Sequence, residues 1–191
     1  MTTITRDQIL EAAAQIFRAK GFHAASMSDI AQAVNLQKGS LYHHISSKQE
    51  ILLAILDIAL DVLIDGMIDV MRQPVPADEK LRIAIDTYLD TLTQRPDLAA
   101  VLLLEHRSLD PALRARHIPR RDRFENLWRQ IIEEGLEQGV FVSSNPGLAV
   151  KALLGILNWT IMWYRPDGAL SARQIAAHSA DLFLNGLSVR N

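Results

Sequence analysis

The chain has 191 residues, of which 49% are hydrophobic and 22% are charged. This length suffices for a sizeable core and allows one domain or a small domain joined to a larger one. No cysteine is present, which excludes a disulfide scaffold, a cysteine nucleophile and a cysteine-bound metal centre. The net charge of −2 argues against a protein that coats nucleic acid by bulk positive charge, so any contact with DNA must come from a local, shaped surface.

The N-terminal sequence and the hydropathy pattern predict no secretion and no membrane contact. Polar Thr2 and Thr3 follow Met1, where a signal peptide would have a basic stretch and an apolar run. The longest strongly apolar stretch, 152–164, carries Asn158 and Thr160 and is too short to cross a bilayer. We therefore expect a cytoplasmic protein.

Helical periodicity extends through almost the whole chain. Apolar residues recur at spacings of three and four, without a convincing run of strict alternation, which predicts an all-α fold of about nine helices. Pro74 and Pro76 stop a long fourth helix and mark the best domain boundary, and Pro119 is expected to break or kink the seventh helix. The first two helices are expected between Thr5 and Gly21 and between Ser26 and Asn35, and the others at about 38–44, 48–71, 78–93, 97–107, 111–138, 146–164 and 171–188.

Capping residues define several helix ends. Gly21 is expected to end the first helix in a left-handed conformation, and Asn35 can adopt the same conformation in a tight turn. Four pairs of polar residues spaced three apart predict caps at helix starts. These pairs are Thr5–Gln8, Ser26–Asp29, Ser47–Glu50 and Ser171–Gln174.

Residues 26–44 fit a helix-turn-helix, in which two short helices are joined by a tight turn. The second helix suits a DNA major groove, which admits an α-helix. Leu41 and Ile45 anchor it, and Lys48 begins the next helix, where its charge and free backbone N–H groups favour a phosphate. The remaining candidates offer a charge, close backbone approach, hydroxyl groups or imidazoles, and they are Lys38, Gly39, Ser40, Tyr42, His43 and His44.

The charge of residues 1–50 is only weakly positive, because five basic residues stand against four acidic ones. Such a module gains affinity from binding as a pair and from hydrogen bonds to phosphate. Tyr42 either contacts a phosphate or mainly packs. One of His43 and His44 is expected to touch DNA.

One ordered set of residues carries a family resemblance. It comprises Ser26, Ile30-Ala31, the run Gly-Ser-Leu-Tyr-His-His at 39–44, and the run Ser-Lys-Gln-Glu-Ile-Leu at 47–52. This set resembles the signature of TetR-type (tetracycline-repressor-like) transcriptional regulators. Asn35 replaces the usual turn glycine, and Gln37 replaces the usual small hydroxylic cap, so the recognition helix is expected to be less firmly capped.

The resemblance implies a DNA-binding domain at 1–47 and a helical ligand-binding and dimerisation domain at 48–191, with 48–72 as the connecting helix. It implies a ligand-responsive regulator, most simply a repressor that a small molecule releases from a palindromic operator. Residues implied to face bases or the nearby backbone are Lys38, Gly39, Ser40 and Tyr42. Residues implied to hold phosphates are Ser26, Ser28, His43, His44 and Lys48.

The helices at 146–164 and 171–188 are apolar around too much of their circumference to lie alone on a surface. One side can pack on the chain's own core and the other on a second subunit, and Gly155 and Gly186 would allow close approach. We predict a two-fold homodimer with a four-helix bundle across its axis. Its recognition helices would face half-sites about 34 Å apart, or a multiple of that distance.

Eight residues in the second half are candidates for lining a small-molecule pocket, since apolar walls with a few polar groups describe such a site. A filled core is the alternative at each position. Asn158 is the most informative, because an amide in so apolar a helix must find a protein or ligand partner. The candidates are Tyr88, Leu92, Leu103, His106, Trp128, Asn158, Trp159 and Met162.

Residues 107–129 hold seven arginines against three acidic residues, the largest local charge in the chain. Arginine binds phosphate or carboxylate bidentately, so this cluster is either an anion site or a solvated helix face. The runs 103–107 and 158–168 are similar to TetR-type regulators that sense acyl-coenzyme A thioesters. That similarity implies an acyl-CoA effector.

Asp57, Asp61, Asp65 and Asp69 repeat every four residues along the fourth helix. A metal row is conceivable, but like charges at this spacing repel, so we favour a solvated stripe. The sequence lacks the common nucleotide, hydrolase and metalloprotease motifs and any Glu-x-x-His pair. We expect no enzyme, no metal and no cofactor. A helical adaptor that binds only protein is the other alternative.

Overall fold

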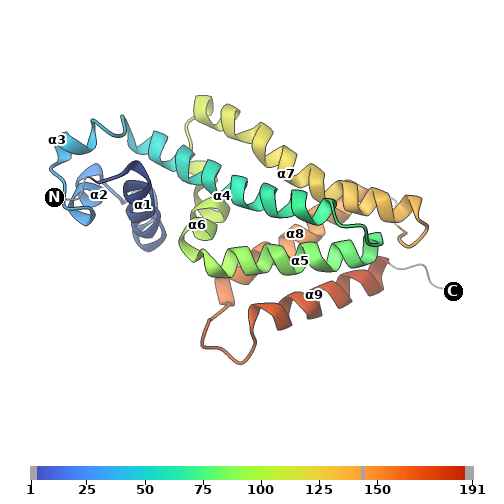
Figure 1. Ribbon diagram of the computed structural model, residues 1–191. Coiled ribbons are helices and arrows are strands. Elements are labelled where there is room, and N and C mark those ends of the chain that lie inside the picture. The colour runs from blue at the N-terminus through green and yellow to red at the C-terminus, as the bar shows by residue number, and fades with distance from the viewer. Residues whose placement is uncertain (1–3, 143–144, 188–191) are drawn as a thin grey trace. The chain divides into compact units, whose positions relative to one another are not determined.

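The computed structural model describes residues 4–142 and 145–187, and the regular elements in these ranges are all helical (Figure 1). Nine α-helices are found there, which confirms the predicted fold class. A π-helical turn, η1, and a 3-10 turn, η2, lie between α6 and α7. The bounds are α1 Arg6–Lys20, α2 Met27–Ala33, α3 Lys38–Leu41, α4 Lys48–Met71, α5 Ala77–Gln94, α6 Pro96–Ala100, η1 Val101–Glu105, η2 His106–Ser108, α7 Pro111–Glu137, α8 Pro146–Trp163 and α9 Ala172–Leu187.

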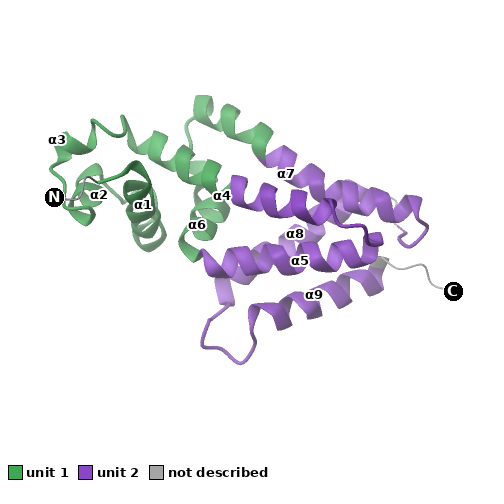
Figure 2. Ribbon diagram, viewed as in Figure 1, with its two compact units in different colours: residues 1–60, 96–120 green, residues 61–95, 121–191 purple. Residues whose placement is uncertain are grey.

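The chain divides into two compact units (Figure 2). Unit 1 comprises residues 1–60 and 96–120, and unit 2 comprises residues 61–95 and 121–191. This division differs from the expected boundary after residue 47, because part of α4 and the segment 96–120 join the N-terminal helices in unit 1.

Polar contacts within unit 1 explain why the segment 96–110 belongs to it. The Glu105 carboxylate accepts a hydrogen bond from the Phe22 N–H at 3.1 Å. The Gln49 side chain donates to the Ser108 carbonyl at 2.9 Å and accepts from the Asp110 N–H at 3.0 Å. These bonds join residues that lie 59 to 83 positions apart in the sequence, which no local pattern can reveal.

The predicted helix caps are largely confirmed. Both hydrogen bonds of the capping box form at Thr5–Gln8, Ser26–Asp29 and Ser171–Gln174. At the start of α4 only half of the box forms, because Ser47 accepts from the Glu50 N–H while the Glu50 carboxylate accepts from the Ser46 hydroxyl. Gly21 ends α1 with φ 79° and ψ 153°, a conformation that strongly favours glycine.

Three helices differ from their predicted form. α3 ends at Leu41 instead of 44, and the N–H groups of His43 and His44 donate to the carbonyls of Ser40 and Leu41, each three residues earlier. The helix expected at 97–107 changes to π and then 3-10 geometry after Ala100. α7 continues through Pro119, so the expected break is absent.

In unit 2, α5 packs against α9 and α8. Leu81, Ala84 and Ile85 on α5 are fully buried. The start of α5 is fixed to α7 by an ion pair between Lys80 and Glu134 at 2.8 Å, in which the lysine is 6% exposed.

α8 is long and apolar enough to span a membrane by length and composition, with a mean hydropathy of 1.2 over 18 residues. The apolar stretch predicted from the sequence, 152–164, is shorter than this helix. Only 22% of this window is buried, and the buried residues include Val150, Leu153 and Leu157.

Candidate nucleic-acid interface and effector site

A tight turn joins α2 to α3 in unit 1. Asn35 adopts φ 55° there, as predicted, and its N–H donates to the Gln32 carbonyl. The next N–H, of Leu36, donates to the Ala31 carbonyl at 2.8 Å. Gln37 makes no side-chain capping bond to α3, which confirms the predicted weaker cap.

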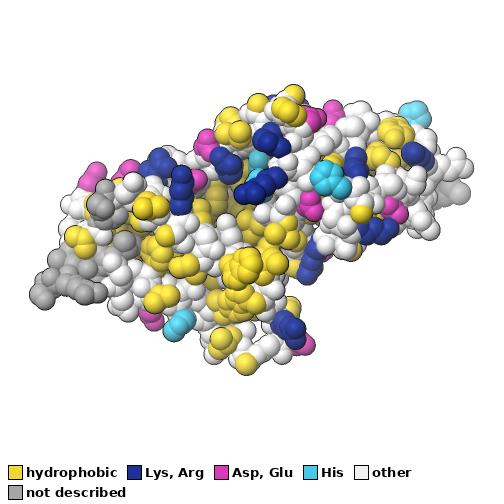
Figure 3. All heavy atoms as spheres, turned by 180° about the vertical axis from the view of Figure 1, so that it is seen from behind, with side chains coloured by type: hydrophobic (Ala, Val, Ile, Leu, Met, Phe, Trp, Pro, Cys, Tyr) yellow, Lys and Arg dark blue, Asp and Glu magenta, His cyan; other side chains and the backbone are white. Residues whose placement is uncertain are grey.

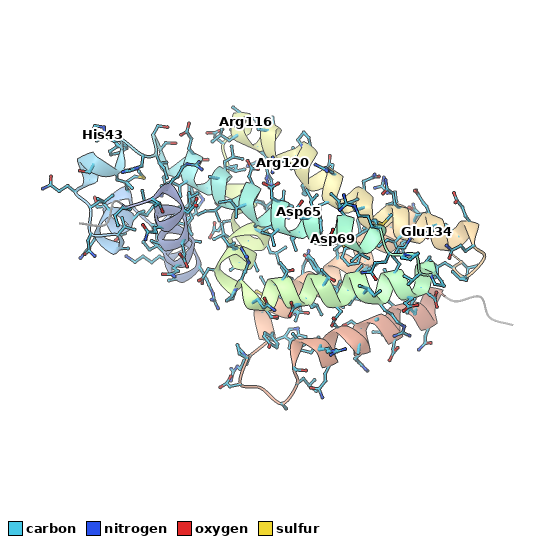
Figure 4. The ribbon with its side chains drawn as sticks, viewed as in Figure 1. His43, Asp65, Asp69, Arg116, Arg120 and Glu134 are labelled. Atoms are coloured by element: carbon cyan, nitrogen blue, oxygen red, sulfur yellow. The ribbon has the colours of Figure 1, made fainter. Side chains whose placement is uncertain are left out.

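The short recognition helix exposes its polar residues and buries its apolar ones. Leu41 and Ile45 are 0% and 5% exposed, so they fix α3 and the following turn on unit 1. Tyr42 is 46% exposed, which favours a contact outside the chain over a purely packing role. The other exposed candidates are Ser28, Lys38, Gly39, His43, which Figure 4 labels, and His44; Ser40 is half-buried.

The described part of the chain leaves room for a side chain at position 39, so packing does not require glycine there. A Cβ atom built at this position meets nothing within 4 Å. Alanine would also favour the helix over glycine. Glycine at this exposed place therefore suits the close approach of an outside partner to the α3 backbone.

Ser26 is committed to its helix cap. Its hydroxyl donates to the Asp29 carboxylate at 2.7 Å and accepts from the Asp29 N–H at 3.1 Å. The same carboxylate pairs with Lys20, and hydrogen bonds from Lys20 and Ser26 lower the pKa of Asp29 to about 2. Since phosphate oxygens accept hydrogen bonds, Ser28 is better placed than Ser26 to donate one.

Lys48 is engaged inside unit 1. Its ammonium group donates to the carbonyls of Phe22 at 2.8 Å and Ala25 at 2.6 Å, and it lies 4.5 Å from the centre of the Phe22 ring. These bonds attach the start of α4 to the loop between α1 and α2. The structure therefore gives Lys48 a positioning role that the sequence did not suggest.

Two basic residues of the N-terminal segment remain for an outside anion. Arg18 pairs with Asp97 at 2.9 Å and Lys20 pairs with Asp29, whereas Arg6 and Lys38 form no ion pair in the described ranges. Arg6 lines an open hollow of about 330 Å³. Its other lining residues are Tyr42, His43, His44, Ile45, Ser46 and Glu50. Sequence reasoning missed Arg6, because only the tertiary fold brings the start of α1 beside the end of the recognition helix.

The aspartate row of α4 is not one uniform site. Asp65 and Asp69, labelled in Figure 4, are exposed, in keeping with a solvated stripe. Asp57 instead faces the Arg120 Nε atom of α7 at 3.3 Å within unit 1. Among residues 4–142 and 145–187, no three potential metal ligands lie together.

Some arginines of the cluster at 107–129 form hydrogen bonds or ion pairs within the chain. Arg114 donates to the carbonyls of Arg107 and Leu109, and Arg120 pairs with Asp57. The cluster also falls into both units, with 107–120 in unit 1 and 121–129 in unit 2. The exposed arginines with neither an ion pair nor a side-chain hydrogen bond among the described residues are Arg107, Arg116 (labelled in Figure 4) and Arg123.

Three of the eight pocket candidates meet in unit 2. The Tyr88 hydroxyl donates to the Asn158 side-chain oxygen at 2.6 Å, so Asn158 has the partner that its setting required. The Tyr88 and Trp128 rings stand edge to face with centres 5.7 Å apart, and Phe124 stacks beside Tyr88 at 5.7 Å. Burial raises the pKa of the Tyr88 hydroxyl. We call Tyr88, Phe124, Trp128 and Asn158 the aromatic cluster.

The other pocket candidates lie elsewhere. Leu92 is buried in unit 2, whereas Leu103 and His106 belong to unit 1 and are half-buried. Trp159 and Met162 are 64% and 53% exposed, so they do not line the interior of unit 2. α8 is apolar on all sides, and its buried face carries Asn158 and Leu157 instead.

The exposed side of α8 is apolar along most of its length, as Figure 3 shows from behind. A Cβ atom at Gly155 on this side would meet nothing within 4 Å. Exposed apolar patches of this kind mark interaction surfaces. We call this the α8 face, and its residues are Leu148, Ile156, Trp159, Met162 and Trp163, with Leu182 of α9 also exposed.

Two family models match the chain. The model described as "Bacterial regulatory proteins, tetR family" covers residues 9–55, and "Tetracyclin repressor-like, C-terminal domain" covers residues 74–187. The HTH-type transcriptional repressor KstR2 of Mycobacterium tuberculosis is 27% identical over 188 residues, which cover 96% of this chain and 92% of the relative.

Solved structures are similar over nearly the whole chain. The TetR family transcriptional regulator PfmR from Thermus thermophilus is 37% identical with a TM-score of 0.87, covering 97% of this chain and 100% of that one. AibR, solved in complex with isovaleryl coenzyme A and operator DNA, is 26% identical with a TM-score of 0.86, covering 93% of this chain and 96% of that one.

Proposed function

The chain belongs to the TetR family of bacterial regulatory proteins, and we propose that it binds operator DNA with the surface around α3. It is a ligand-responsive transcriptional regulator whose partners are operator DNA, a second copy of the chain and a small-molecule effector. The family and its named relatives are regulators and not enzymes. We place the protein in the cytoplasm, where a regulator reaches chromosomal DNA.

The proposed DNA surface consists of exposed or half-buried residues, most of whose polar side-chain groups form no hydrogen bond within the described chain. Lys38, Gly39, Ser40 and Tyr42 enter the major groove and approach bases or the nearby backbone. Ser28, His43, His44 and Arg6 contact phosphates. Ser26 and Lys48 belong to the same surface, but they act mainly by holding α2 and α4 in place, since their polar groups are already hydrogen-bonded.

One observation carries this proposal. Arg6 and Lys38 are the lysine and arginine residues of 4–50 that form neither an ion pair nor a side-chain hydrogen bond among the described residues, since Arg18 and Lys20 are ion-paired and Lys48 binds carbonyl groups. They accompany exposed Gly39, where a Cβ atom would meet nothing within 4 Å. A mobility-shift assay with the DNA upstream of the protein's own gene tests it. Lys38→Gln should weaken the shift, whereas Arg18→Gln, which removes a charge already paired with Asp97, should leave it almost unchanged. Equal effects of both changes would contradict the assignment.

The proposed homodimer forms through residues 146–164 and 171–188. The α8 face supports this, because its large apolar side chains remain uncovered in the single chain. Gly155 leaves space for a partner helix to approach. Two-fold pairing would bury both copies of the face and place two recognition helices on a palindromic operator.

The proposed effector is an acyl-CoA thioester. AibR, a structural neighbour, was solved with isovaleryl coenzyme A, and unit 2 of this chain contains an aromatic cluster with polar groups. Exposed Arg123, which lies in unit 2 like the aromatic cluster, offers a charge for a phosphate of coenzyme A. The effector would release the repressor by binding the DNA-free conformation more tightly.

Calorimetric titration with isovaleryl-, octanoyl- and palmitoyl-coenzyme A tests the effector class. At least one should bind and weaken the mobility shift. Free coenzyme A is the control and should bind more weakly, since it brings no acyl chain. Binding without any change in the shift would contradict the release mechanism, and no heat from any thioester would contradict the effector class.

A further inference from the structure

The indole N–H of Trp128 is a buried hydrogen-bond donor without an acceptor. Trp128 is 0% exposed on α7, and its Nε1 atom contacts no acceptor in the described parts of the chain. The large majority of buried side-chain polar atoms in folded proteins have a hydrogen-bond partner, and leaving one unpaired is destabilising. This orphan donor therefore points to a group that the chain itself does not supply.

The neighbours of Trp128 explain why no side chain of the aromatic cluster satisfies it. Tyr88 and Phe124 present rings to the indole, with ring centres 5.7 Å and 6.3 Å away. The Tyr88 hydroxyl donates to the Asn158 side-chain oxygen at 2.6 Å, so these two groups pair with each other and not with the indole. The indole N–H is thus a fully buried donor of the aromatic cluster for which no atom of the cluster is the acceptor.

We propose that the Trp128 N–H donates a hydrogen bond to the thioester carbonyl oxygen of the effector. This inference rests on the proposed acyl-CoA function and assigns the chemical group that the cluster binds. Indole nitrogen only donates, so its partner must be an acceptor. An oxygen atom on an apolar acyl chain meets that need, and the chain itself can pack against the aromatic rings.

The absence of charged side chains in the aromatic cluster favours an uncharged acceptor over a carboxylate. None of its four side chains is charged, so a carboxylate bound there would be buried without a counter-ion from the cluster, which is costly. An uncharged carbonyl needs only the one donor that Trp128 offers. The cluster therefore favours a thioester over the corresponding free fatty acid.

The test compares two ligands that differ in the carbonyl alone. In S-octyl-coenzyme A a methylene group replaces the thioester carbonyl of octanoyl-coenzyme A. Calorimetry on the full-length protein should show that octanoyl-coenzyme A binds about tenfold more tightly, the effect of one hydrogen bond. In Trp128→Phe this ratio should fall to about one. Loss of packing in the variant affects both ligands and cancels in the ratio.

Phe124→Leu is the matched control. It disturbs the same rings and keeps the indole, so it should weaken both ligands and retain the roughly tenfold ratio. A measurement on the unmodified protein covers the case in which Trp128→Phe does not fold. With ¹⁵N-labelled tryptophan, the buried indole N–H resonance should move downfield on addition of octanoyl-coenzyme A and stay in place with S-octyl-coenzyme A.

The outcomes separate this inference from the function on which it rests. Equal affinities of the two ligands for the unmodified protein, or a ratio that Trp128→Phe retains, would overturn the role of Trp128 and leave the acyl-CoA effector standing. No binding of either ligand would overturn both. Operator binding by the same preparation would then still support the proposed DNA surface.

Discussion

Replacing Arg6 by glutamine should make operator binding less sensitive to salt. Arg6 lines the hollow beside Tyr42, His43 and His44 and forms no ion pair in the described ranges, so we expect it to neutralise one phosphate per subunit. Each phosphate contact contributes about −0.9 to the slope of log Kobs against log salt concentration. Two copies in a dimer make the slope about 1.8 units less steep.

The same arithmetic predicts how the affinity deficit changes with salt. A rise from 50 to 200 mM salt is fourfold, so the deficit of Arg6→Gln should shrink about twelvefold over this range. Fluorescence anisotropy with a labelled operator at five or more salt concentrations measures both slopes. Arg18→Gln is the matched control, because it removes an arginine from the same helix whose charge pairs with Asp97 at 2.9 Å. If the slope of Arg6→Gln equals that of the unmodified protein, or if Arg18→Gln changes it as much, the assignment of Arg6 to a phosphate is refuted.

Three further changes test the DNA-binding surface, its support and the dimer. Gly39→Ala should leave stability unchanged or raise it by up to about 1 kcal/mol, since the new Cβ meets nothing, yet weaken operator binding; unaltered binding would show that DNA does not approach α3 closely. Asp29 has a pKa of about 2 in the folded chain, below its unfolded value, so its stabilisation is complete above about pH 4 and is lost as the pH falls towards 2. Circular dichroism should therefore show that Asp29→Asn is destabilising at pH 7 but not at pH 2, and an equal loss at both would count against this carboxylate. Trp159→Glu should raise the dimer dissociation constant by at least about a thousandfold, taking on the order of 2 kcal/mol for each of the two tryptophans buried in the dimer. Ile118→Glu is the control, because Ile118 is an exposed apolar residue outside the α8 face. Sedimentation should show that this control variant remains dimeric.

Local chemistry made the N-terminal helices predictable. A hydroxyl three residues before an acceptor side chain favours a capping box, and both bonds form at Thr5–Gln8 and Ser26–Asp29, whereas only one forms at Ser47–Glu50. Asn35 tolerates the positive φ that the turn requires. Each of these features depends on neighbouring residues alone, so the sequence contains all that is needed to predict it.

Features that depend on distant residues were not predictable in this way. Glu105 lies 83 residues from its partner Phe22, and Lys48 binds carbonyl groups 23 and 26 residues earlier. Backbone carbonyl groups are present at every residue, so no sequence motif distinguishes the ones that receive the Lys48 ammonium group. The position of Arg6 beside the recognition helix was not predictable for the same reason. An arginine at a helix start is common, and only the packing of α1 brings this one close to Tyr42, His43 and His44.

α8 shows where periodicity stops being informative. Its apolar residues surround the helix, so the hydrophobic pattern cannot say which arc faces the core. In the structure, Leu157 and Asn158 lie on the side of α8 that faces the interior of unit 2. The next residue, Trp159, is rotated by about 100° around the helix axis and lies on the exposed side. One helix therefore carries both the hydrogen bond to the aromatic cluster and the face that we assign to the dimer. If the proposed effector shifts the α8 backbone at Asn158, Trp159 moves with it, because adjacent positions on an intact helix shift together. The proposed effector site and the proposed dimer face would then be coupled through α8.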